Sequence, residues 1–335
     1  MPAPPLDASI VIPNYQGREV LPPTLRALEA ALAASPCRAE VLVVDDASQD
    51  GSPELVAREH PDVRVVRQTR NRGFGPTANL GAEQARAPRV FFLNSDVSVH
   101  PGFLAPLVQQ LDVADRFSVA SIHLDEEGRV RTPNQVAPEM RRGQIRLRGL
   151  DLDPLRRAGR LAALGPLRTL FGSGGSLLVR RDRFLELGGF AAAFAPFYYE
   201  DTDLGWRAWR RGWSTVVDPR SVVTHRKGGS IPSTRRRGFV KTIRKRNRFL
   251  LVWRNLVDPG AFRRRHLARL PLQVAGSLLR GDVTVVQGLG RAWRLRRGIA
   301  AFRGAERAAA NLTDEEIFSR LERERARLER ALDEA

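Results

Sequence analysis

Residues 40–46 read EVLVVDD, an apolar and β-branched run that ends in two carboxylates. Such a run is typical of a strand buried on both faces of a parallel sheet. Strands that alternate with helices predict an α/β fold, with a mostly parallel sheet covered on both faces. Similar runs and segments of helical spacing predict further strands at 8–13, 63–66 and 90–93 and helices at 18–34, 52–60 and 77–86.

Polar side chains follow three of these predicted strands at their carboxyl ends. They are Asn14-Tyr15, Asp45-Asp46 and Asn94-Ser95-Asp96. Ligands of open parallel sheets bind beyond this edge. Asp and Asn also start turns and cap helices, so one pair alone would indicate little. Three sets at three strand ends favour a binding site.

The usual phosphate-binding motifs, GxGxxG after the first strand and GxxxxGK[ST], do not occur in the sequence. Residues 70–75 instead read RNRGFG, a basic turn that can bring guanidinium and backbone N–H groups to a diphosphate. An ordinary glycine-containing loop has the same composition, and the residues alone leave both interpretations open. In residues 171–181 (FGSGGSLLVRR), glycines such as Gly174 and Gly175 would let a ligand approach the backbone closely.

Residues 198–204 read YYEDTDL and place three carboxylates at an expected helix N-terminus. The helix dipole stabilises anions there, so capping is one interpretation. Asp203 and Arg207 have the i,i+4 spacing of a structural ion pair. A carboxylate beside aromatic residues is also a candidate general base.

His225 follows two short strands expected at 214–218 and 221–224. A lone histidine is more often structural than a metal ligand. Its candidate partner Asp96 is distant in the sequence, so spacing alone does not decide between a structural histidine and a metal ligand.

Eight motifs follow one another along the chain: SIVIPNY, VDDASQDGS, RNRGFGPTANLGA, FLNSDV, FGSGGSLLVRR, GGF, YYEDTDLGWRAWRRGW and VVTHRKGGS. Their order resembles that of the family 2 inverting glycosyltransferases with the GT-A fold. Within that family, the chain is most similar to bacterial rhamnosyltransferase-like members that build polysaccharides or lipid-linked glycans. The resemblance covers about residues 8–230. It implies a GT-A, Rossmann-like sheet and inverting transfer of a sugar from a nucleotide-sugar donor to a hydroxyl of a glycan or lipid-linked glycan.

The resemblance also implies roles for individual residues. Asp201 corresponds to the catalytic base, and Asp96 and His225 to ligands of a divalent cation, Mg²⁺ or Mn²⁺, on the donor diphosphate. Asp46 corresponds to the carboxylate that binds the nucleotide base of the donor. The implied nucleotide-binding residues are Pro13, Asn14, Tyr15, Asp46, Arg72, Gly73, Asn79, Asn94 and Ser95, and the implied acceptor or donor-sugar pocket contains Gly174, Gly175 and Glu200.

Two positions depart from the family pattern. Asn94 replaces the first carboxylate of the DxD motif, and residues 191–193 are alanines where an acidic pair is common. Asn94 supports a second hypothesis, a catalytically inactive scaffold that binds sugar nucleotides at a membrane. A nucleotidyltransferase shares the alternating α/β pattern, but the Glu200-Asp201 and His225 motifs argue against it.

The net charge of +18 lies in one segment. Residues 226–310 hold 22 Lys and Arg against 3 Asp and Glu, a net +19, so the remainder carries −1. Arginines beside Phe249–Trp253, Leu278-Leu279 and Trp293 predict helices in the interface of an anionic membrane. Packed helices with solvated arginines are the alternative. No nucleic-acid recognition motif accompanies the charge, so nucleic acid is not an expected partner.

The last segment predicts a separate amphipathic helix. Thr313 and Glu316 have capping-box spacing, and an apolar stripe follows amid alternating Arg and Glu. This helix is expected to dock on the protein or to pair with a second copy in a homo-oligomer. The stripe consists of Ile317, Leu321, Leu328 and Leu332.

The expected organisation is a catalytic domain at 1–230, a basic helical region at 231–310 and the final helix at 311–335. Cys37 is the single cysteine, and neither a secretory signal nor a spanning segment of about 20 apolar residues is visible. Together with the basic segment, these features predict a cytoplasmic protein that is peripheral on the inner face of the cytoplasmic membrane. The resemblance implies a bacterial source.

Overall fold

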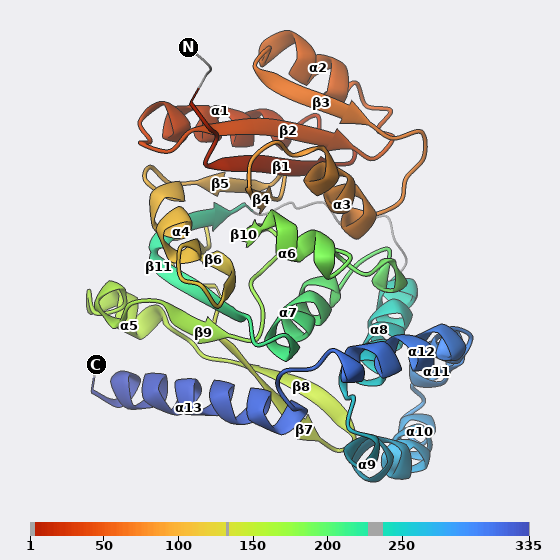
Figure 1. Ribbon diagram of the computed structural model, residues 1–335. Helices are drawn as coiled ribbons and strands as arrows, with labels where there is room; N and C mark the ends of the chain where they lie inside the picture. Colours follow the sequence, from red (N-terminus) through yellow and green to blue (C-terminus); the bar gives the residue numbers. More distant parts are fainter. Residues whose placement is uncertain (1–3, 132–133, 227–236, 335) are drawn as a thin grey trace.

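The computed structural model describes residues 4–131, 134–226 and 237–334, and a nine-stranded mixed sheet forms its centre (Figure 1). The sheet order is β3-β2-β1-β4-β10-β6-β11-β5, and β9 pairs with β11. β1 to β4 are parallel, and β10 runs antiparallel between β4 and β6. The strands of the sheet are β1 (Ala8–Asn14), β2 (Ala39–Asp45), β3 (Val63–Arg67), β4 (Arg89–Leu93), β5 (Val97–Val99), β6 (Arg116–Leu124), β9 (Leu167–Thr169), β10 (Ser176–Arg180) and β11 (Ser214–His225).

Helices cover both faces of the sheet, which confirms the predicted fold class. Successive residues of each strand point to opposite faces, and Ile10 and Val11 of β1 enter two different cores. α1 and α4 pack on the first face, and α3 and α6 on the second. The helices of this half are α1 (Leu21–Ala33), α2 (Ser52–Glu59), α3 (Phe74–Gln84), α4 (Leu104–Leu111), α5 (Asp153–Arg157), α6 (Arg181–Glu186) and α7 (Glu200–Arg210).

The predicted strands and helices of the N-terminal half are all present, with shifted ends. The helix predicted from residue 77 begins at Phe74, because Pro76 is tolerated in a first turn. The two strands expected at 214–218 and 221–224 form the single strand β11, whose pairing with β6 shifts register after Asp218. The boundary expected between residues 230 and 231 lies outside the described residues.

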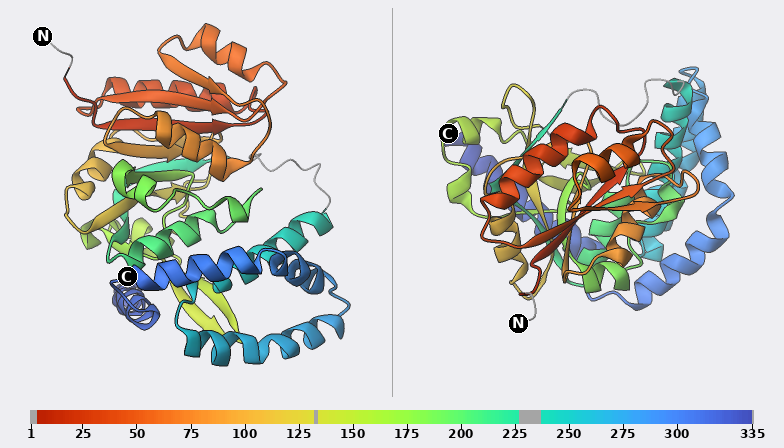
Figure 2. Two further views of the ribbon diagram at one scale, coloured as in Figure 1. Left: turned by 45° about the vertical axis from the view of Figure 1, so that its right-hand side comes forward. Right: turned by 90° about the horizontal axis from the view of Figure 1, so that it is seen from above.

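The C-terminal helices pack beside a hairpin of β7 (Val136–Arg141) and β8 (Gln144–Gly149), at the opposite end of the molecule from β3 (Figures 1 and 2). Phe249–Trp253 are at most 4% exposed and pack in one core with Trp206 and Trp209 of α7. The expectation that this stretch faces a membrane is therefore wrong, because α7, α11 and α12 pack against α8. The helices are α8 (Arg237–Asn255), α9 (Pro259–Ala261), α10 (Leu270–Leu278), α11 (Thr284–Trp293), α12 (Arg296–Ala308) and α13 (Asp314–Asp333).

The final helix, α13, docks on the rest of the chain along β7 and β9. Its capping box is formed, with Thr313 Oγ1 accepting from Glu316 N–H and Glu316 Oε2 accepting from Thr313 N–H. Ile317, Leu321 and Leu328 of the apolar stripe are fully buried within the chain. The stripe thus packs intramolecularly instead of facing a second copy. Across the described ranges, no helix has both the length and the apolar character needed to cross a bilayer.

Candidate active site

A cavity of about 500 Å³ lies at the carboxyl ends of β1, β2 and β4. The glycine-rich loop before α3, the segment before β10 and the start of α7 complete its wall. Most of the predicted site residues meet here although they come from distant parts of the sequence. Those that line the cavity are Pro13, Asn14, Tyr15, Asp46, Gly73, Asn94, Ser95, Asp96, Gly174, Gly175, Glu200, Asp201 and His225.

Asp46 holds the glycine-rich loop over one wall of the cavity. Its Oδ1 accepts a 2.7 Å hydrogen bond from the backbone N–H of Arg72, and its Oδ2 a 2.8 Å bond from that of Gly73. Burial raises the pKa of Asp46, and these two N–H donors oppose the rise. The carboxylate and the loop that the resemblance assigns to nucleotide binding are therefore in direct contact.

Two predicted nucleotide-binding residues, Arg72 and Asn79, are not among the residues that line the cavity. Arg72 contributes its backbone to Asp46. The Asn79 amide pairs with the backbone of Phe190, accepting at Oδ1 over 2.8 Å and donating from Nδ2 over 2.9 Å. Asn79 thus joins α3 to the segment that follows α6.

The neighbouring Asp45 has the turn-forming role that Asp often plays. Its Oδ1 accepts from Asn14 Nδ2 over 2.9 Å and its Oδ2 from the Ser48 N–H over 3.0 Å. Asn14 is 1% exposed and also donates to Ser52 Oγ. These bonds join the ends of β1 and β2 beneath the cavity.

Asp96 and His225 meet although they are distant in the sequence. β5 pairs antiparallel with β11, with His225 opposite Val97. His225 Nε2 consequently lies 3.3 Å from Asp96 Oδ2, and His225 Nδ1 contacts the Arg131 guanidinium. Asp96 Oδ1 is buried without a partner among the described residues.

The glycines before β10 make room for side chains of the cavity wall. A Cβ on Gly174 would lie 3.1 Å from the Phe74 ring, and one on Gly175 would lie 2.9 Å from the Asn94 amide. Asn94 N–H also donates to the Gly175 carbonyl over 3.1 Å. The small residues therefore permit the antiparallel approach of β10 to β4 at the point where the cavity forms.

Glu200 and Asp201 begin α7 with their carboxyl groups at the cavity. Asp201 Oδ1 accepts 2.7 Å from the Thr202 N–H, and Glu200 Oε2 is buried without a partner among the described residues. Burial, followed by the charge of Asp201, raises the pKa of Glu200 to about 8. Burial also raises the pKa of Asp201, although the hydrogen bond from the Thr202 N–H lowers it in part. Glu200 therefore keeps its proton near neutral pH.

The raised pKa of Glu200 predicts a pH-dependent effect of Glu200→Gln on stability. Between its ordinary pKa of 4.5 and its folded value of about 8, the folded chain keeps a proton that the unfolded chain has released. Wild-type stability therefore falls as the pH rises through this window. Glutamine has no proton to lose, so the melting temperature of the variant should gain on that of wild type between about pH 5 and pH 8. A constant difference between the two melting temperatures across this pH range would exclude the pKa shift.

The segment before α7 is held by α8, a contribution that the sequence pattern does not reveal. Tyr198 and Tyr199 both have positive φ, of 75° and 76°. Asn247 of α8 is fully buried and its Nδ2 lies 2.8–3.0 Å from the carbonyls of Phe194, Phe197 and Tyr198. The C-terminal helices thus fix the backbone that presents Glu200 and Asp201. Other lining residues not predicted individually are Asn71, Phe74, Thr77, Ser173, Pro196, Phe197 and Tyr198.

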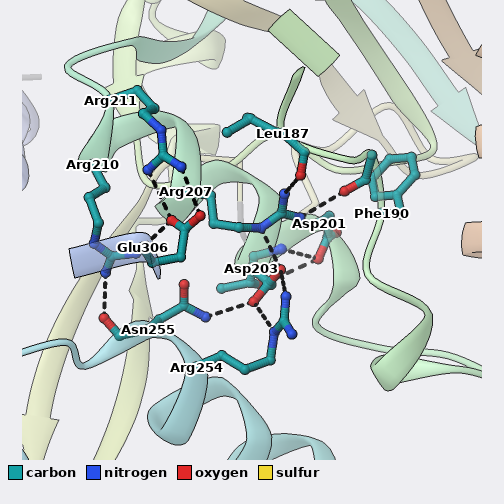
Figure 3. Close-up of polar contacts among 12 residues, drawn as sticks. Leu187, Phe190, Asp201, Asp203, Arg207, Arg210, Arg211, Arg254, Asn255 and Glu306 are labelled. Atoms are coloured by element: carbon teal, nitrogen blue, oxygen red, sulfur yellow. Dashed lines mark hydrogen bonds and ion pairs between the residues drawn. The ribbon is translucent and has the colours of Figure 1, made fainter. Parts of the chain in front are cut away.

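Asp203 of α7, two residues after Asp201, forms a buried ionic cluster (Figure 3). Its oxygens accept from Arg207 Nε over 2.8 Å, Arg254 Nε over 2.9 Å and Asn255 Nδ2 over 2.9 Å. Burial alone would raise the pKa of Asp203, but Arg207 and Arg254 outweigh it and lower the pKa to about 2. The predicted i,i+4 pair of Asp203 and Arg207 is confirmed. Arg254 and Asn255 extend the cluster from α7 to α8.

A second cluster joins α7 to the last two helices (Figure 3). Arg210 is fully buried and contacts Glu306 of α12 and Asp314 of α13. Arg211 pairs with the same Glu306 at 2.9 Å. One helix therefore carries the candidate catalytic carboxylates at its start and anchors the C-terminal region further along.

Sequence comparisons identify a family and curated relatives of this chain. The family model described as glycosyl transferase family 2 matches residues 9–186. An N-acetylglucosaminyl-diphospho-decaprenol L-rhamnosyltransferase of Mycobacterium tuberculosis is 33% identical over 210 residues, which span 57% of this chain and 67% of the relative. The succinoglycan biosynthesis protein ExoO of Rhizobium meliloti is 38% identical over 109 residues, 32% of this chain and 30% of that protein.

Solved structures of similar fold include Staphylococcus aureus TarS 1–349 in complex with UDP-GlcNAc, with a TM-score of 0.53 and 16% identity over 96% of this chain and 91% of that one. The mannosyltransferase PcManGT from Pyrobaculum calidifontis, in complex with GDP-Man and Mn²⁺, has a TM-score of 0.52 and 17% identity over 96% and 86%. These neighbours confirm the predicted GT-A fold. Because the family model covers more than half of the chain, this protein is a member of glycosyl transferase family 2.

Proposed function

We propose that this chain transfers a sugar from a nucleotide-sugar donor to a hydroxyl group of a lipid-linked glycan, with inversion at the anomeric carbon and with a divalent cation. The observation that carries the proposal is the convergence of Asp46, Asp96 and Asp201 on one cavity of about 500 Å³. The acceptor class is supported by the mycobacterial relative, whose name specifies a lipid-linked N-acetylglucosaminyl diphosphate.

Asp201 is the proposed base. An acceptor hydroxyl is a poor nucleophile until its proton is removed. The Asp201 carboxylate takes this proton while the hydroxyl oxygen attacks the anomeric carbon opposite the nucleoside diphosphate. The new glycosidic bond forms as the bond to the diphosphate breaks, so one displacement inverts the configuration. Burial raises the pKa of Asp201, which strengthens it as a base while it remains ionised.

Asp96 and His225 fit a divalent cation. Asp96 offers the unpartnered Oδ1, and His225 Nε2 lies 3.3 Å from Oδ2 of the same carboxylate. The described residues contain no set of three His, Cys, Asp or Glu side chains suited to a metal, so diphosphate oxygens and water would complete the shell. When bound, Mg²⁺ or Mn²⁺ supplies positive charge to the leaving diphosphate. Neutral His225 can use Nε2 as a ligand only with its proton on Nδ1, so Arg131 must release that nitrogen.

Removing the Asp96 carboxylate should weaken cation binding. We expect Asp96→Ala to lower Mn²⁺ affinity in the presence of a nucleoside diphosphate by at least about tenfold, since it removes a direct ligand. Electron paramagnetic resonance of free Mn²⁺ measures this without any turnover. Asp125→Ala is the matched control, because Asp125 pairs with Arg129 at 2.9 Å and does not line the cavity. Equal affinity in the two variants would remove Asp96 from the cation site.

A donor panel tests the proposed function. The protein is incubated with a lipid-linked N-acetylglucosaminyl diphosphate and dTDP-rhamnose, UDP-sugars or GDP-sugars, with and without EDTA. Transfer from at least one donor, abolished by EDTA and restored by Mn²⁺, is expected. Donor binding without transfer or hydrolysis across the panel would instead support the inactive scaffold that Asn94 suggests.

A further inference from the structure

A second cavity of about 400 Å³ lies between the β7–β8 turn, α8 and α10, and it shares no lining residue with the first. The turn residues Arg142 and Gly143 both have positive φ, which is typical of a tight hairpin. Gln144 Nε2 donates to Gln273 Oε1 over 2.6 Å and joins the hairpin to α10. The basic residues that line the cavity are Arg142, Lys245, Arg248, Arg269 and Arg280.

No acidic side chain lines this cationic pocket. Among the described residues, Lys245 is the only one of the five cations with an ion pair, a 3.7 Å contact to Asp282 that Lys241 shares. The buried Nε2 of Gln273 also lacks a partner among the described residues. The pocket therefore offers several cationic hydrogen-bond donors, and no acidic side chain lines it to balance their charge. This arrangement suits a phosphate.

Exposed apolar side chains adjoin the pocket. Leu272 lines it and is 74% exposed, and Leu278 and Leu279 near the end of α10 are 52% and 88% exposed. Of the twelve exposed large apolar side chains in the described residues, eight lie between residues 267 and 295. Such clustering marks an interaction surface. In Figure 2, α10 lies at the outer edge of the molecule, away from β1–β3.

We propose that this pocket binds the phosphate of an anionic membrane phospholipid while Leu272, Leu278 and Leu279 enter the bilayer interface. An anionic bilayer matches both features at once, because its phosphates complement the arginines and its acyl region accepts the leucines. A soluble phosphate leaves the leucines unexplained, and a nucleic acid offers no acyl region for them. The proposal does not depend on sugar transfer.

The pocket also has a structural link to the candidate active site. α8 carries Lys245 and Arg248 to the pocket, and Asn247 of the same helix binds the segment that presents Asp201. A bilayer bound at the pocket would therefore lie against the helix that supports the sugar-transfer cavity.

Vesicle flotation of the full chain tests the proposal. We expect flotation with vesicles of phosphatidylcholine and phosphatidylglycerol, and little with phosphatidylcholine alone. Arg269→Gln/Arg280→Gln and, separately, Leu278→Glu/Leu279→Glu should each lower the partition coefficient by roughly tenfold or more. The native positions of these leucines are solvent-exposed, so the second variant should fold normally.

Matched controls separate this pocket from a general charge effect. Arg323→Gln/Arg330→Gln removes two exposed arginines of α13, and Val113→Glu/Leu185→Glu adds two carboxylates at exposed apolar positions elsewhere. Both should float like wild type. Failure of wild type to float with anionic vesicles, or equal losses in the pocket and control variants, would overturn the proposal. Calorimetry with inorganic phosphate alone distinguishes a soluble-anion site. Phosphate binding by a wild-type protein that does not float with anionic vesicles would exclude the lipid.

Discussion

Asp201→Asn is expected to reduce the turnover of sugar transfer by about 10²–10⁴-fold while the protein remains folded. The amide cannot take the acceptor proton, but it is nearly the same size as the carboxylate. Its oxygen can still accept the hydrogen bond from the Thr202 N–H. Because burial raises the pKa of Asp201, an uncharged group at this position should not lower stability.

The measurement is turnover at saturating donor and acceptor, together with the melting temperature of each protein. Glu200→Gln is the neighbouring control, since Glu200 is expected to be protonated at neutral pH and its loss should have a much smaller effect. An Asp201→Asn variant that folds and turns over within about tenfold of wild type would remove Asp201 from the role of base.

Asp203→Ala, two residues further along α7, should instead destabilise the fold by about 3–5 kcal/mol. The substitution leaves Arg207 and Arg254 buried without the carboxylate that neutralises them. Both arginines are less than 10% exposed, so water cannot replace the lost partner. The cluster also joins α7 to α8, so the loss should affect the packing of the C-terminal helices.

Thermal and urea unfolding measure this effect. The matched control is Glu54→Ala, which breaks the ion pair of Arg67 and Glu54, whose side chains are 53% and 57% exposed. An exposed pair contributes at most about 1 kcal/mol. Equal destabilisation by the two substitutions would contradict the prediction that breaking the buried Asp203 cluster costs more stability than breaking an exposed pair.

The sequence predicts the N-terminal half of the fold well for a physical reason. Strands buried on both faces require uninterrupted apolar runs, and those at residues 8–13 and 40–46 correspond closely to β1 and β2. The polar residues at the ends of β1, β2 and β4 meet at one cavity, because parallel strands end at the same edge. The Thr313 capping box is equally local, and it forms as predicted.

Long-range pairing is not predictable from local patterns. The contact of His225 with Asp96 depends on the three-residue strand β5 and its register on β11. The support of the segment before α7 by Asn247 depends on how α8 packs, and a lone asparagine in a basic helix has no distinguishing pattern. Phe249–Trp253 shows the converse case, since an apolar run beside arginines can face a protein core as well as a membrane.

The anomeric configuration of the product tests the central claim most directly. Nuclear magnetic resonance of the glycan formed by the wild-type protein compares the new linkage with the configuration of the sugar in its donor. If Asp201 activates the acceptor for a single displacement at this cavity, the configuration of the product is opposite to that of the donor. A product that retains the donor configuration would contradict the proposed mechanism.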